Sequence, residues 1–138
     1  ISFGYHPYLC LPGVERSAWR VEMPVSHRVV LDEEELPSGR MEEARIEAGS
    51  LGDRTFDDEF AAPTGSAPFV LQGEGRRVEV SLGEGYPWAQ VYAPDDDDVI
   101  AFEPMTTPTN ALVRQGPELP LVEPGESYLA RFSIVVAG

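Results

Sequence analysis

Short runs of alternating polar and apolar residues recur along the chain, separated by glycine, proline and aspartate. The clearest run spans 77–82, and its three apolar residues point to one face of a half-buried strand. The segment 130–135 repeats the pattern and is expected to turn Phe132 and Ile134 inward. The same pattern and β-branched runs predict further strands at 19–23, 27–31, 69–72, 89–92 and 99–103.

The turn residues between these runs predict an all-β fold. Thirteen glycines and thirteen prolines supply the special φ values that tight turns need. No helical stretch is long enough for the crossovers of a parallel sheet, so an antiparallel β-sandwich is expected. No repeat or linker divides the chain, which predicts a single domain over 1–138. The Glu- and Arg-rich stretch 32–48 is expected to be a surface excursion, either helical or disordered.

Net charge narrows the classes of partner. The 138 residues carry 10 basic and 24 acidic side chains, a formal charge of -14. Such a surface repels polyanions, so neither nucleic acid nor an anionic membrane is an expected partner. A neutral small molecule such as a sugar feels little of this field, whereas a phosphorylated ligand is mildly disfavoured.

Neither disulfides nor metal sites are predicted. Cys10 is the one cysteine, which favours a reducing compartment, and no apolar run approaches the roughly 20 residues of a membrane span. We therefore expect a cytoplasmic protein. The aspartates 95–98 lack the ligand spacing of a calcium loop, and His6, His27 and Cys10 show no paired zinc spacing. No metal and no cofactor is expected.

Two segments contain residues suited to proton transfer. His6 stands between Tyr5 and Tyr8 and precedes a proline that interrupts strand pairing, so the imidazole can point away from the ladder. Glu103 ends an apolar strand, and burial there would raise its pKa toward the range of a general base. Each residue alone also has a plain structural interpretation: a histidine in an aromatic patch, and a glutamate at a strand end.

The acidic segment 55–60 is flanked by aromatic residues, a combination that binds sugars. Its carboxylates, Asp57 among them, accept hydrogen bonds from hydroxyls while aromatic rings cover the apolar face of a sugar. Tyr5, Tyr8, Trp88 and Tyr92 can supply such rings. The alternatives are a turn stabilised by its own aspartates and simple core packing of the aromatic residues.

Taken together and in this order, four segments resemble the aldose 1-epimerases, or galactose mutarotases. They are 3–9 (FGYHPYL), 57–60 (DDEF), 91–94 (VYAP) and 102–106 (FEPMT) running into 108–111 (PTNA). The resemblance covers essentially the whole chain. It implies that His6 protonates the ring oxygen of a free aldohexose, that Glu103 removes the anomeric proton, and that Asp57 holds sugar hydroxyls. It implies no cofactor.

Members of this family are about twice as long and form one β-supersandwich. The resemblance therefore implies that this chain is the C-terminal half, and that an upstream half supplies a second histidine and an arginine to the pocket. Without the strands of the other half, the sheets of this chain are expected to expose edges that favour self-association. Two other functions stay open. One is an epimerase for a hexose 6-phosphate, which needs positively charged side chains to bind the phosphate, and the other is a carbohydrate-binding module without turnover.

Overall fold

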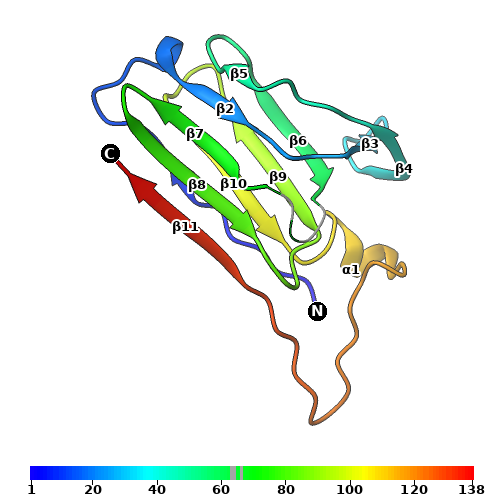
Figure 1. The fold of residues 1–138 in the computed structure, drawn as a ribbon. Coiled ribbons are helices and arrows are strands. Elements are labelled where there is room, and N and C mark those ends of the chain that lie inside the picture. Colours follow the sequence, from blue (N-terminus) through cyan, green and yellow to red (C-terminus); the bar gives the residue numbers. More distant parts are fainter. Residues whose placement is uncertain (63–64, 66) are drawn as a thin grey trace.

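The computed structural model describes residues 1–62, 65 and 67–138, and in this part of the chain the strands form two antiparallel sheets. The sheets face each other as the two layers of a sandwich (Figure 1). The first sheet has the order β1-β10-β9-β6-β3-β4 and the second has the order β11-β8-β7-β2-β5. The strands of the first sheet are β1 (Tyr8–Leu9), β3 (His27–Leu31), β4 (Pro37–Glu43), β6 (Phe56–Ala61), β9 (Trp88–Ala93) and β10 (Ile100–Met105). Those of the second are β2 (Arg20–Glu22), β5 (Gly49–Ser50), β7 (Phe69–Gly73), β8 (Arg76–Leu82) and β11 (Phe132–Ala137).

Apolar side chains from the facing sides of both sheets form the core. Every second residue of β8 and of β9 is buried, as the alternating sequence predicts. The rings of Phe69 on β7 and Phe102 on β10 lie 5.3 Å apart between the sheets. Trp19, 1% exposed, closes one end of the core, and its indole N–H donates to the carbonyl of Val14 at 2.9 Å.

Helix is limited to short turns. The structure has a 3₁₀ turn, η1 (Arg16–Ala18), and one turn of α-helix, α1 (Ala111–Arg114). In the described ranges, no helix has both the length and the apolar character needed to cross a membrane. The predicted all-β class and antiparallel sandwich are therefore confirmed.

Two local predictions were wrong. The stretch 32–48 is neither helical nor disordered throughout, because it contains β4, which pairs with β3. Ile134 lies opposite the buried Val80 and so faces the same side, yet it remains 41% exposed, whereas Phe132 is partly buried. The alternating pattern predicts which side of the strand a residue faces, but β11 is an edge strand of the second sheet, where a side chain on the core side can remain partly exposed (Figure 1).

The register of three central strands brings polar residues together on the outer face of the first sheet. Directly opposed residues of antiparallel strands point to the same face. Glu103 of β10 lies opposite Gln90 of β9, and Gln90 in turn lies opposite Glu59 of β6. Two residues along the strands, and so on the same face, Tyr92 lies opposite Asp57.

Candidate active site

His6 lies where the N-terminal segment runs along β10, the strand next to the edge strand β1. Gly4 forms an isolated bridge with Met105, and the N–H of Tyr5 donates to the carbonyl of Pro104 at 3.1 Å. Pairing resumes at β1, beyond Pro7, which has no N–H to donate. The interruption at residues 6 and 7 leaves the imidazole free to turn across β10.

The side chains of His6 and Glu103 meet. Nε2 of His6 lies 3.0 Å from Oε1 of Glu103, and the two side chains are 45% and 12% exposed. This separation brings a group that can act as an acid directly beside one that can act as a base. Both residues line one cavity of about 310 Å³, here called the His6 pocket, whose other lining residues are 2–5, Met105 and 107–110.

The environment of Glu103 favours its neutral form. Burial, and to a lesser degree the negative charge of Asp57, raises the pKa of Glu103 from 4.5 to about 7. Glu103 is thus a carboxyl group that can both accept and return a proton near neutral pH.

Aromatic rings surround the exposed side of His6. The ring of Tyr8 lies 4.5 Å from the imidazole and that of Tyr92 lies 5.9 Å from it. Both tyrosines also line a neighbouring hollow with Pro94, 96–97 and Val99. Trp88 also lies on the outer face of the first sheet, opposite Met105 of β10. It lines neither the His6 pocket nor the larger cavity beside that pocket. Of the four aromatic candidates, Tyr8 and Tyr92 have rings beside the imidazole, whereas the ring of Tyr5 lies 5.2 Å from that of Phe132.

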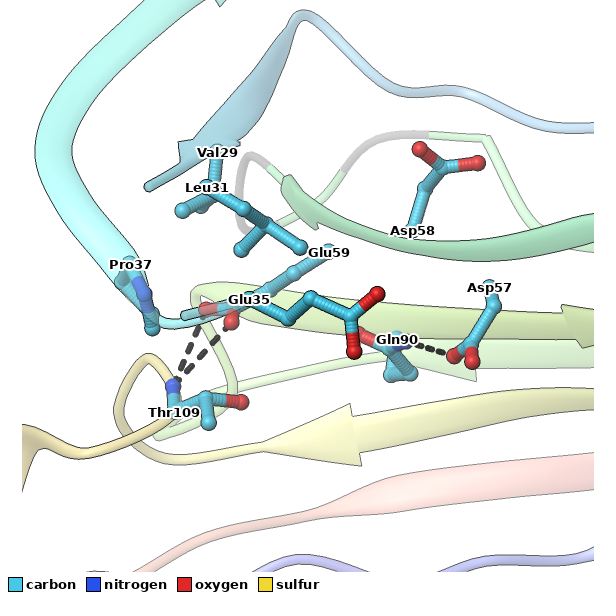
Figure 2. A pocket seen from close by; sticks show the side chains of 9 residues that line it. All are labelled: Val29, Leu31, Glu35, Pro37, Asp57, Asp58, Glu59, Gln90 and Thr109. Atoms are coloured by element: carbon cyan, nitrogen blue, oxygen red, sulfur yellow. Dashed lines mark hydrogen bonds between the residues drawn. The ribbon is translucent and has the colours of Figure 1, made fainter. Parts of the chain in front are cut away.

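A second cavity, of about 380 Å³, lies beside the His6 pocket and is here called the acidic pocket. Asp57 and Gln90 line it, and Nε2 of Gln90 donates to Oδ1 of Asp57 at 2.7 Å (Figure 2). Thr109 lines both cavities, so the two pockets share a wall. The remaining lining residues are Val29, Leu31, Glu35, Pro37, Asp58 and Glu59.

Glu59 is the most buried carboxylate of the acidic pocket. Its residue is 5% exposed, and its two oxygens accept the backbone N–H of Thr109 at 3.1 and 3.3 Å (Figure 2). Burial raises the pKa of Glu59, and the hydrogen bonds from Thr109 oppose the rise.

Gln90 was not predicted from the sequence, and Glu59 was included there only as part of the acidic segment 55–60, without a role of its own. His6, Asp57 and Glu103 were predicted, and the structure gathers them on and beside one face of the first sheet. Gln90 lies between Asp57 and Glu103 only because β9 runs between β6 and β10, a pairing that links distant segments. The alternation in 88–93 does indicate that Gln90 faces away from the core.

The charge of the two pockets is acidic. Among the described residues that line them there is no arginine, and the nearby Arg28 is held by Glu42 and by Asp58, at 3.3 Å from the latter. Over the same described ranges, no group of three or more His, Cys, Asp or Glu residues is placed to hold a metal ion.

Two solved structures share this fold. A galactose mutarotase-like protein from Clostridium acetobutylicum matches 98% of this chain at 18% identity with a TM-score of 0.79. An Escherichia coli K12 protein, whose assignment as an aldose 1-epimerase is itself provisional, matches 96% at 18% identity with a TM-score of 0.60. This chain covers 47% of each, so it spans about half their length. No curated protein sequence matches it.

These likenesses define the class: a protein with a galactose mutarotase-like fold. The sequence model of the aldose 1-epimerase family matches residues 1–135, which is nearly the whole chain. The chain belongs to the aldose 1-epimerase family, as its residue pattern predicted.

Proposed function

We propose that the protein containing this chain is an aldose 1-epimerase that interconverts the α and β anomers of a free aldohexose. The observation that carries the proposal is the 3.0 Å contact between Nε2 of His6 and Oε1 of Glu103 at the wall of an open cavity. Family membership supports the same reaction class.

The chemistry needs two proton transfers at neighbouring oxygens. The Glu103 carboxylate accepts the proton of the anomeric hydroxyl while the N–H of His6 donates one to the ring oxygen. The bond between the anomeric carbon and the ring oxygen breaks, which leaves an open-chain aldehyde. Because both oxygens are bonded to one carbon, the acid and the base must lie close together, as His6 and Glu103 do.

Closing the ring reverses the two roles. The aldehyde carbon rotates about its bond to the next carbon, and the hydroxyl that closes the ring attacks the other face. Its proton returns to His6, and Glu103 gives its proton to the new anomeric oxygen. The pKa of about 7 suits Glu103 to both directions, because neither protonation state is strongly favoured near neutral pH.

The acidic pocket suits the hydroxyls of the sugar. Asp57 and Gln90 supply a carboxylate and an amide, which together accept and donate hydrogen bonds. Tyr8 and Tyr92 supply aromatic surface beside the imidazole. In the family, an upstream half is expected to add a second histidine and an arginine, so the proposal concerns the full natural protein.

The charge of the pockets favours a neutral sugar over a hexose 6-phosphate. A phosphate dianion needs cationic or N–H-rich surroundings, whereas the described pockets present carboxylates. Two candidate functions remain: the epimerase, and a carbohydrate-binding module that uses the same face without turnover.

Polarimetry separates these two functions. Freshly dissolved α-glucose or α-galactose is followed with and without the full-length protein. We expect mutarotation faster than the spontaneous rate and proportional to protein concentration. An unchanged rate combined with measurable sugar binding would leave the binding module as the function.

A further inference from the structure

We propose that Glu59 is a positioning residue: by holding the N–H of Thr109 it fixes the wall shared by the two pockets, and so couples the hydroxyl-binding strand β6 to the His6–Glu103 pair. This inference rests on the proposed function. It assigns a role to a buried carboxylate that the proton transfers themselves do not use.

The shared wall begins directly after β10, the strand that carries Glu103. Residues 106–110 follow β10 and lead into α1, and Thr109 lines both the His6 pocket and the acidic pocket. Both oxygens of Glu59 accept its N–H. Since Glu59 is two residues from Asp57 on the same face of β6, the contact ties this wall to the strand that carries Asp57.

The other end of the wall is tied to the segment that carries His6. The N–H of Thr106 donates to the carbonyl of Phe3 at 3.0 Å, and the N–H of Phe3 donates to the hydroxyl oxygen of Thr106 at 3.0 Å. The hydroxyls of Ser2 and Thr107 lie 2.6 Å apart. Residues 106–110 are therefore held at one end by the N-terminal segment that carries His6 and at the other end by Glu59.

Burial of Glu59 needs an explanation beyond packing. A carboxylate costs free energy when it leaves water, and an apolar residue would fill the same place without that cost. Here the 5% exposed side chain meets a backbone donor that has no other hydrogen-bond acceptor among the described residues. The charge-assisted hydrogen bond is stronger than one from a neutral acceptor and sets the position of Thr109.

Other charged groups lie around both carboxylates. Glu35, Asp57 and Asp58 line the acidic pocket with Glu59, and all four are acidic. Glu103 faces His6 at 3.0 Å and is influenced by the charge of Asp57. Replacing Glu59 by either a polar or an apolar residue removes the same charge from this group, so a comparison of two such variants isolates the hydrogen bond to Thr109.

The test compares Glu59→Gln and Glu59→Leu in the full-length protein. Glutamine keeps an acceptor for the N–H of Thr109 and leucine does not. Amide hydrogen exchange of 106–110 should accelerate by about tenfold in Glu59→Leu and stay near wild type in Glu59→Gln. Glu79→Gln and Glu79→Leu, on β8 of the other sheet, are the matched controls and should leave this exchange unchanged.

Kinetics then separate positioning from a purely structural role. Each variant is assayed at a temperature equally far below its own unfolding midpoint. Glu59→Leu should then lower kcat/KM for mutarotation by about tenfold or more, whereas Glu59→Gln should stay within about threefold of wild type. Loosening the wall should also hydrate Glu103, so the acid limb of the kcat/KM profile should move to lower pH in the leucine variant alone.

Each outcome has a definite meaning. Equal exchange and equal kcat/KM in the two Glu59 variants would overturn the proposal, as would an effect of the same size in Glu79→Leu. Absence of mutarotation by the wild-type protein would instead overturn the proposed function. In that case faster exchange in Glu59→Leu alone would still support the anchoring of Thr109 by Glu59.

Discussion

At the scale of single residues, Glu103 combines a buried position with a partner that can share its proton. Its pKa of about 7 lies above the ordinary 4.5, so in the folded protein the neutral form is favoured. The stability associated with this group is therefore fully present below about pH 4.5 and is lost as the pH rises through about 7.

This linkage predicts a pH-dependent difference between wild type and Glu103→Gln. Glutamine does not titrate, so only the wild type must bury a charge at high pH. Between about pH 4 and about pH 8 the unfolding free energy of wild type should fall relative to the variant, by roughly 3 kcal/mol. Urea unfolding at several pH values measures it. A constant difference would show that Glu103 titrates near its ordinary pKa.

Asp57 is expected to act on binding. Asp57→Asn keeps an oxygen for Gln90 but removes the charge that strengthens hydrogen bonds from sugar hydroxyls. Because such contacts exist in both ground and transition states, KM should rise by about tenfold while kcat changes little. Steady-state polarimetry decides this, and a loss confined to kcat would assign Asp57 to the proton transfers instead.

At the scale of elements, the close approach of the N-terminal segment to β10 positions His6. A Cβ added at Gly4 would lie 2.8 Å from the carbonyl oxygen of Pro104, which is backbone and has little room to move. A Cβ added at Gly49 of β5 would have no neighbour within 4 Å, so this glycine provides a matched control.

Gly4→Ala should therefore displace His6 from Glu103. We expect kcat to fall by about tenfold or more, since small misplacements of catalytic groups have large effects on rate, with the far-ultraviolet circular dichroism unchanged. Gly49→Ala should retain the wild-type kcat. Equal kcat in both variants would show that the 4–5 segment adapts without moving the imidazole.

The sequence predicted strands correctly where polar and apolar residues alternate, and it did not predict the strand in which they do not. The half-buried strands β8 and β9 have such a period, and their positions were predicted to within one residue at each end. β4 has none, because only Pro37 is buried and the other residues are exposed, so its charged sequence resembles a surface loop. The cross-strand neighbours of Gln90 are determined by the register of β9 with β6 and β10. The local sequence pattern of one strand does not contain this information.

At the scale of the whole molecule, one free edge is apolar. β11 pairs with β8 on one side only, and its exposed residues include Ile134, Val135 and Val136, at 41%, 53% and 73%. By contrast, the edge strand β4 carries Arg40, Glu42 and Glu43. Charged edges resist pairing with another chain and apolar edges favour it.

We therefore expect the 138-residue chain to self-associate through β11. Val135→Lys should increase the monomer fraction in sedimentation velocity, whereas Met41→Lys on β4, which is 43% exposed, should not. A wild-type chain that stays monomeric at the highest concentration reached, or equal effects of both lysines, would contradict this expectation.

The central claim is that Glu103 is the base paired with His6, and one measurement tests it most directly. Steady-state polarimetry of the full-length protein compares wild type with Glu103→Gln, which keeps the size of the side chain and removes its ability to take a proton. The account predicts that kcat falls by about 10²-fold or more while KM stays near wild type. Wild-type kcat in the Glu103→Gln protein would contradict it and assign the base to another residue.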